Sequence, residues 1–230
     1  MHDWPFATAI TGARTIASAG AWSGVAGNAD RTNGDEAVVV FGYCPPVEDP
    51  AIPVLTGVDR QPRHEMGLPD ALAVLDALAG AGCRTWVHGG WGVDALLQEQ
   101  TRPHDDLDLV VDVTQWPAVR EALSHLGYTV VVDGMPGNTV LLDPAGRQVD
   151  LHPARIDRAG NARYSGDDGS AWDIPADALH SRGAIAGREV ACLGPEIEVA
   201  SHAGYALDDD DRADVAALVA RFGVRPPTGF

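Results

Sequence analysis

From residue 68 onward the apolar positions alternate between helical spacing and short continuous runs, which predicts an α/β (α+β) domain. The first pattern predicts a helix over 68–81 that starts near Pro69 and ends at Gly80 and Gly82. Further helices are predicted over residues 91–98, 114–126, 195–207 and 213–222, with Thr114 as the cap of the second of these four. Strands are predicted over 85–88, 107–113, 128–132, 139–142 and 148–152, followed by a loop over 155–170 and a small hairpin around Gly187.

The first 65 residues lack this periodicity and are rich in Ala, Gly, Thr and Pro. Within them, residues 37–43 (AVVVFGY) resemble a strand, and a Pro-rich stretch follows. We therefore expect residues 1–65 to be a poorly ordered N-terminal extension, residues 66–224 to form the domain, and residues 225–230 to be a tail. An alternative is that translation begins at Met66, where the compact pattern starts.

The charge is strongly acidic, with 33 acidic residues against 16 basic ones and a formal net charge of −17. All basic residues are Arg and none forms a basic face, so we expect no binding of nucleic acid or of an anionic membrane. The acidity favours a small cationic partner, although it is also explained by solubility alone.

Cysteine usage and the hydrophobic runs make a cytoplasmic location the default expectation. Three widely spaced cysteines argue against a disulfide framework or a zinc cluster. No apolar run approaches the roughly 20 residues of a membrane span, and the N-terminus lacks the basic start of a signal peptide.

Two carboxylates, Asp106 and Asp108, lie two positions apart in a predicted strand, so they share one face about 7 Å apart. Like charges this close repel unless a cation lies between them. Gly89-Gly90 forms the upstream corner between a strand and a helix, where backbone N–H groups can approach a phosphate. The pattern predicts an Mg²⁺ site that holds a nucleoside triphosphate. The alternative is an ordinary half-exposed strand, in which charged and apolar residues also alternate.

A third carboxylate, Asp150, lies on another apolar strand and is costly to bury unless it is paired or binds a metal. With the first two it would complete a cluster for one or two Mg²⁺ ions that also deprotonates an incoming hydroxyl. A solvated aspartate at a strand end is the alternative. The His104-Asp105 doublet opens a strand, which disfavours a metal-dependent phosphohydrolase site. The chain has no Gly-x-Ser-x-Gly elbow, and the absence of Lys excludes a Walker loop.

Several motifs in order resemble known families. The sequence GGWGVDALL, then TRPH, then DLDL at residues 106–109 is similar to the signature of polymerase-β-type nucleotidyltransferases. More narrowly, it resembles antibiotic nucleotidyltransferases, namely the aminoglycoside 2''-adenylyltransferase and lincosamide nucleotidyltransferase relatives. DLHP at 150–153, GAIAGR at 183–188 and HAGY at 202–205 resemble further motifs of this group. The resemblance covers residues 68–222, and His88 before the glycines is a departure from it.

This resemblance implies a polymerase-β-like nucleotidyltransferase core, in which a mixed sheet has flanking helices and C-terminal helices follow. The implied activity is Mg²⁺-dependent transfer of a nucleoside monophosphate, AMP from ATP, to a hydroxyl of a small acceptor. A lincosamide or aminoglycoside antibiotic is the implied acceptor.

The resemblance also assigns roles. Asp106 and Asp108 would hold Mg²⁺, and Asp150 would be the general base and a further metal ligand. Gly89 and Gly90 would approach the phosphates, with Arg102 as a clamp.

The acceptor side would include His152, His202 and Tyr205, the last two lying three residues apart on one helix. Structural alternatives stay open: Arg102 pairing with the acidic cluster, His152 as a structural residue, and the other two as a helix-packing pair. Two other functions also stay open, modification of a protein partner and non-catalytic nucleotide binding; three intact carboxylates argue against the second.

Overall fold

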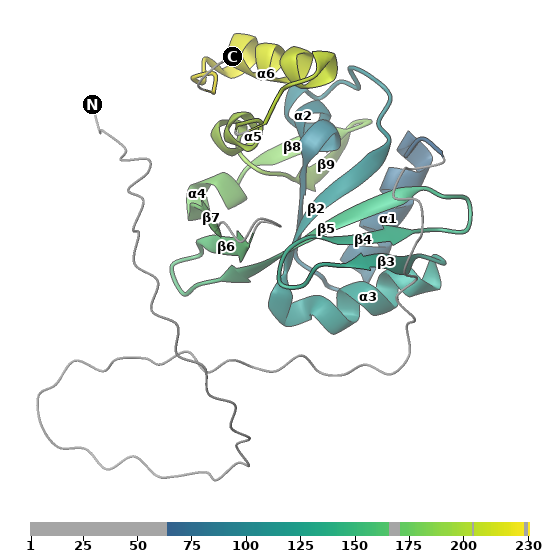
Figure 1. The fold of residues 1–230 in the computed structure, drawn as a ribbon. Helices are drawn as coiled ribbons and strands as arrows, with labels where there is room; N and C mark the ends of the chain where they lie inside the picture. Colours follow the sequence, from purple (N-terminus) through teal and green to yellow (C-terminus); the bar gives the residue numbers. More distant parts are fainter. Residues whose placement is uncertain (1–63, 166–170, 204, 228–229) are drawn as a thin grey trace, which may run out of the picture. The chain divides into compact units, whose positions relative to one another are not determined.

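The computed structural model describes residues 64–165, 171–203, 205–227 and 230 (Figure 1). The strand predicted at 37–43, and the order expected of residues 1–63, lie outside the described residues. The described part falls within one compact unit of the chain, Glu48–Phe230.

A mixed sheet forms the centre of the domain, with the strand order β1-β2-β5-β4-β3. Strands β2 and β5 are parallel, and the other neighbours on this path are antiparallel. Two short strands, β6 and β7, continue the sheet from the far end of β5. The bounds are Thr85–His88 for β1, Asp106–Asp112 for β2, Thr129–Asp133 for β3, Thr139–Leu142 for β4, Gln148–Ile156 for β5, Ala162–Ser165 for β6 and Ala171–Ile174 for β7. The predicted mixed sheet is confirmed.

The helices form two groups (Figure 1). Helix α1 (Leu68–Gly80) packs with α3 (Trp116–His125), while α2 (Gly89–Leu97) packs with α5 (Pro195–Ser201) and α6 (Asp209–Phe222). The short helix α4 (Ala176–Leu179) contacts α5.

In strand β2, the alternation of apolar and polar residues determines which side chains face the core. Leu107, Leu109 and Val111 are fully buried in the main core, together with side chains of α1 and α3. The alternate positions face the other way, so Asp106 and Asp108 lie on the opposite face of the sheet from that core.

The start of α3 differs from the prediction, because Thr114 does not cap it. A 3₁₀ turn, Val113–Gln115, precedes the helix, and Asp112 caps this turn. One oxygen of Asp112 accepts hydrogen bonds from the backbone N–H and the hydroxyl of Thr114 at 2.9 and 2.8 Å. The helix ends as expected before Gly127, whose φ is +87°.

The loop predicted over 155–170 is wrong where the structure describes it. Strand β5 runs on to Ile156, and β6 and β7 pair beyond it. Ala162 and Ile174 are buried in a second apolar cluster with Trp86 and Val110. Strands β6 and β7 are short, and their outward-facing residues are polar. The alternation of apolar and polar residues is therefore too brief to predict a strand from the sequence.

The helix predicted over 195–207 ends at Ser201, and the last helix, predicted over 213–222, begins earlier, at Asp209. Asp208 and Asp211 form a reciprocal capping box at the start of α6, which favours helix initiation and places negative charge at its positive end. The predicted hairpin is confirmed as β8 (Arg182–Ile185) and β9 (Arg188–Ala191), with Gly187 in its turn at φ +76°.

Across the described ranges, every helix is too short or too polar to cross a membrane.

Candidate active site

Three side chains meet in one row across the sheet. In the strand register His88 of β1 is opposite Asp108 of β2, which is in turn opposite Asp150 of β5. The next row pairs Asp106 with Gln148, two positions before Asp108 and Asp150 on the same face. The structure therefore brings together the three carboxylates that the sequence singled out.

The side-chain amides of Gln148 and Asn138 contact the carboxylates of Asp106 and Asp150. Gln148 Nε2 lies 2.8 Å from one oxygen of Asp150 and 3.5 Å from an oxygen of Asp106. Asn138 Nδ2 donates to the other oxygen of Asp150 at 3.2 Å. Gln148 thus bridges two acidic residues of neighbouring strands and fixes where their oxygens lie.

The cluster is electrostatically strained. Burial raises the pKa of Asp106 to about 8, and the negative charges of Asp108 and Asp150 add to the rise. Burial and the charge of Asp108 raise the pKa of Asp150 to about 6. Because all three cannot ionise together at low cost, the cluster is suited to a cation.

Two histidines flank Asp108. Burial alone would raise the pKa of Asp108, but the hydrogen bond with His152 and the charges of nearby histidines together outweigh it, so this pKa falls below the usual range. His152 Nε2 lies 3.3 Å from Asp108 Oδ1. His88 contacts His152 edge to face at a ring separation of 4.5 Å, and burial lowers the pKa of His88 to about 3.

The Gly89-Gly90 corner begins α2 and is packed against the cluster. Gly89 has φ +62°, and a Cβ added there would lie 2.4 Å from Asp108 Oδ2. A Cβ at Gly90 would lie 2.4 Å from His104 Nδ1 and 2.9 Å from Arg102 Nη2. Glycine is therefore required at both positions for lack of space, and at the first also by backbone conformation.

Glu198 of α5 packs against this corner and was not predicted from the sequence. Its side chain is fully buried, and its Oε2 accepts a hydrogen bond from Gly89 N at 3.2 Å. Burial raises the pKa of Glu198 well above its usual range. The Gly89 backbone N–H, which was predicted to meet a phosphate, thus donates to a buried carboxyl group whose protonated form is favoured by burial.

Arg102 lies beside the corner and forms an ion pair with α6. Its Nη2 is 2.8 Å from Asp214 Oδ2, and its Nε is 3.4 Å from Asp214 Oδ1. Its ion-pair partner is therefore in α6, and not in the cluster of Asp106, Asp108 and Asp150 that the alternative above named. The ion pair with Asp214 orients the Arg102 guanidinium over Gly90. Binding of a phosphate by Arg102 remains a prediction.

His202 and Tyr205 do not share a helix, contrary to the prediction, because α5 ends at Ser201. The buried His202 ring has Nδ1 2.8 Å from the Glu198 carbonyl and Nε2 3.7 Å from Asp211 Oδ1. Tyr205 is 55% exposed, and its hydroxyl donates to the same Asp211 oxygen at 3.1 Å. Asp211 therefore contacts both side chains. The charge of His202 also contributes to the lowering of the pKa of His88.

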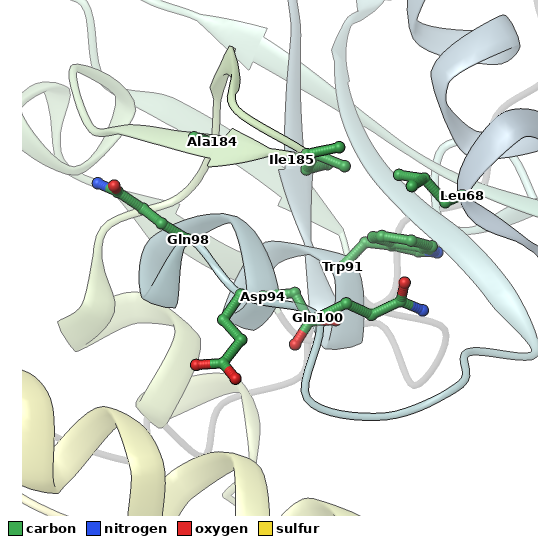
Figure 2. A pocket seen from close by; sticks show the side chains of 9 residues that line it. Leu68, Trp91, Asp94, Gln98, Gln100, Ala184 and Ile185 are labelled. Atoms are coloured by element: carbon green, nitrogen blue, oxygen red, sulfur yellow. The ribbon is translucent and has the colours of Figure 1, made fainter.

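A buried pair explains the TRPH motif structurally. His104 Nε2 lies 2.5 Å from Asp94 Oδ2, and the other Asp94 oxygen accepts hydrogen bonds from Thr101 N and Oγ1. These contacts fix the segment between α2 and β2, and they pair His104 with Asp94 instead of Asp105. Figure 2 shows a pocket on this side of α2, against the β8–β9 hairpin, and none of the predicted site residues lines it.

Sequence reasoning could have found one of the missed residues. Gln148 lies two positions before Asp150 on the same strand, so it shares its face. Asn138 and Glu198 reach the site from other elements, and nothing local in the sequence signals this.

The mixed sheet, its flanking helices and the order of the motifs define the class of protein, a nucleotidyltransferase. The chain belongs to the aminoglycoside-2''-adenylyltransferase family, whose model matches residues 70–218. The predicted fold and enzyme class are confirmed.

Individual relatives agree with this family. A lincosamide resistance protein from Staphylococcus haemolyticus is 28% identical over 145 residues, which cover 63% of this chain and 89% of the relative. The chain is similar to a lincomycin-bound lincosamide antibiotic adenylyltransferase, with a TM-score of 0.61, 26% identity and coverage of 67% of this chain and 98% of that one. A crystal structure of ANT(2'')-Ia with adenylyl-2''-tobramycin shares the fold at a TM-score of 0.53 and 20% identity, covering 66% and 87%.

Proposed function

We propose that this enzyme transfers AMP from Mg-ATP to a hydroxyl group of a lincosamide antibiotic. The observation that carries the proposal is the register of Asp108 with Asp150 on parallel strands, beside a glycine corner that packs directly against Asp108. The lincosamide relatives support the acceptor class, since the chain aligns with most of their length.

The carboxylate cluster fits Mg²⁺ by its chemistry. Its donors are hard oxygens on two rigid strands, and the pKa values of Asp106 and Asp150 are raised by burial and by the neighbouring negative charges, both of which a divalent cation would offset. Asp106, Asp108 and Asp150 would hold the ion. Bound there, Mg²⁺ supplies neutralisation of charge on the triphosphate oxygens.

Asp150 is the proposed general base. The acceptor oxygen attacks the α-phosphorus, the bond to pyrophosphate breaks, and the hydroxyl proton passes to the Asp150 carboxylate. A pKa of about 6 leaves Asp150 ionised at neutral pH while keeping it basic enough to accept a proton. The amides of Gln148 and Asn138 hold its two oxygens in place.

The triphosphate is proposed to lie over the start of α2. Gly90 and the Arg102 guanidinium lie together there, and Asp214 holds the guanidinium in a fixed orientation. A planar guanidinium can bind two phosphate oxygens at once. Glu198 would position the corner from below through its hydrogen bond with Gly89.

The acceptor is proposed to bind between His152 and the Tyr205–Asp211 pair, with Tyr164 as a further wall. The Tyr164 ring contacts His152 edge to face at 5.7 Å, so it lies on the same side of the sheet. Asp211 is partly exposed and offers a carboxylate to a cationic amine.

An aminoglycoside is the second candidate acceptor. The acidic residues Asp208, Asp209 and Asp210 are exposed at the start of α6, next to Asp211. A polycationic sugar would gain more from such a cluster than a ligand with one amine. The family to which the chain belongs is consistent with this acceptor.

A competition assay tests the proposal. The full-length protein is incubated with Mg-ATP and an equimolar mixture of one lincosamide and one aminoglycoside, and products are identified by mass spectrometry. Addition of AMP to the lincosamide in excess is expected. The matched variant Asp108→Asn should lose at least about 10³-fold in rate while keeping its circular dichroism spectrum, since a metal ligand supports several kcal/mol of barrier lowering.

Each other outcome has a defined meaning. An adduct on the aminoglycoside alone would replace the proposed acceptor. Wild-type turnover by Asp108→Asn would contradict the proposed metal and catalytic site. Protein-linked AMP with unmodified antibiotics would show a protein acceptor instead.

A further inference from the structure

His88, Asp108 and His152 converge on one point beside the carboxylate cluster. One ligand atom from each side chain lies within 4.8 Å of the others. They come from three neighbouring strands, β1, β2 and β5, and share one face of the sheet. The hydrogen-bonded backbone of these paired strands fixes the positions from which the three side chains project.

The His88 ring has an unsatisfied polar atom. Its Nε2 is buried and has no hydrogen-bond partner among the described residues. Buried imidazole nitrogens are normally paired with a donor, an acceptor or a metal, because an unpaired one forfeits its hydration. The contact with the His152 ring is edge to face and does not satisfy this nitrogen.

We propose that His88, Asp108 and His152 bind a divalent transition-metal ion of the Zn²⁺ class, at a site separate from that of the nucleotide Mg²⁺. Two imidazole nitrogens and one carboxylate oxygen are a donor set that Zn²⁺ and Co²⁺ favour and that Mg²⁺ disfavours. Small side-chain rotations would bring all three atoms to the roughly 2.0–2.2 Å that Zn²⁺ requires.

Asp108 would be shared between the two sites. One of its oxygens already faces His152 at 3.3 Å, and the ligand atoms that converge belong to His88, Asp108 and His152, a group that does not include Asp106 or Asp150. Loss of Asp106 or Asp150 should therefore leave the second site intact. The inference rests on these side chains and holds whichever acceptor the enzyme uses.

Co²⁺ titration tests the proposal. Tag-free full-length protein is stripped with a chelator and titrated with Co²⁺ alone at pH 7.5, and the visible d–d bands are recorded. One equivalent should give the intense bands of a four- or five-coordinate ion with nitrogen ligands, and one equivalent of Zn²⁺ should abolish them. Excess Mg²⁺ should leave them in place.

Variants then assign the ligands. His88→Ala, His152→Ala and Asp108→Asn should each weaken Co²⁺ binding by more than about 100-fold, since losing even an outer-sphere partner typically costs 10–100-fold. The matched variants Asp106→Asn and Asp150→Asn should keep the bands, and circular dichroism should confirm that each variant folds. His88→Gln provides a second test if the alanine variant does not fold.

Three results would overturn the inference. These are weak octahedral bands in the wild-type protein, undiminished bands in both histidine variants, or equal loss in Asp106→Asn. The last would mean that Co²⁺ occupies the carboxylate cluster instead.

Discussion

Asp108 and Asp150 face each other across β2 and β5, the one parallel strand pair in the described part of the sheet. This pairing sets two carboxylates at the same height on one face, although 41 residues separate them in sequence between positions 109 and 149. Amides from Gln148 and Asn138 restrain Asp150, while His152 restrains Asp108. The two carboxylates therefore have different partners, and their pKa values move in opposite directions.

The pH dependence of catalysis should report the environment of Asp150. Activity should rise with pH along an acidic limb whose midpoint lies at or below about 6, the pKa of Asp150. The reason is that only the ionised Asp150 carboxylate accepts the proton. The hydrogen bond from Asn138 lowers this pKa. Asn138→Ala should therefore move the limb of kcat to higher pH by up to about one unit, the value of one hydrogen bond. An unmoved or lower limb would argue against Asp150 as the base.

The stability of the metal-free protein should fall as pH rises. Asp106 has an ordinary pKa of 3.8 when unfolded and about 8 when folded, so between these values the unfolded chain binds fewer protons than the folded protein. The stabilisation is present below about pH 4 and is lost as pH rises toward 8. Thermal unfolding in a chelator should give a melting temperature several degrees lower at pH 8 than at pH 5.

Asp106→Asn is the matched variant for this effect. It should flatten the slope and raise the melting temperature at pH 8, and Mg²⁺ should stabilise the wild type more than the variant at that pH. Parallel curves for the two proteins would contradict the assignment of the slope to Asp106.

The domain boundary at residue 66 can be tested by truncation. Met66 is fully buried in the core, and its N–H donates to the His104 carbonyl at 2.8 Å. Deletion of residues 1–65 should leave activity and melting temperature nearly unchanged. Deletion of one residue more should cost about 2–5 kcal/mol in the free energy of unfolding, as for other buried methionines. A large loss on the shorter deletion would show that the extension contributes to the domain.

Local sequence patterns were sufficient to predict how Asp106, Asp108 and the Gly89-Gly90 corner are arranged. Asp106 and Asp108 share a face because a strand has a period of two, and the Gly-Gly corner is fixed by its own conformation. The bounds of β1 and β4 follow from short apolar runs flanked by glycine, proline or polar residues.

Long-range contacts decided the parts that the sequence missed. Strands β6 and β7 form because Ala162 and Ile174 complete a distant apolar cluster, and their own outward positions are polar. Helix α5 stops at Ser201 although apolar residues continue to Leu207, since the capping box of Asp208 and Asp211 starts a new helix. Glu198 could not be recognised, because its partner Gly89 is 109 residues away.

Glu198 should act as a neutral side chain. Its pKa lies well above the usual range because of burial, so Gln at this position keeps both the volume and an acceptor for the Gly89 N–H. Glu198→Gln should change the free energy of unfolding by less than about 1 kcal/mol, the net value of one hydrogen bond. Glu198→Ala should lose about 3 kcal/mol or more through the cavity and the orphaned donor. Urea unfolding at pH 7 measures both, and a large loss in the glutamine variant would indicate an ionised carboxylate.

Alanine substitutions at Gly89 and Gly82 separate the effect of the left-handed backbone conformation from the effect of steric room for a side chain. Both have positive φ, +62° and +70°, but an added Cβ at Gly89 meets Asp108 Oδ2 at 2.4 Å whereas Gly82 has nothing within 4 Å. Gly82→Ala should cost about 1–2 kcal/mol of stability and keep kcat/KM, since only the left-handed conformation is penalised. Gly89→Ala has the same penalty and must also displace Asp108, which should lower kcat/KM by about 100-fold or more. Steady-state assays and urea unfolding of the two variants measure this contrast. Equal kcat/KM in both would show that Asp108 does not need the space that Gly89 leaves.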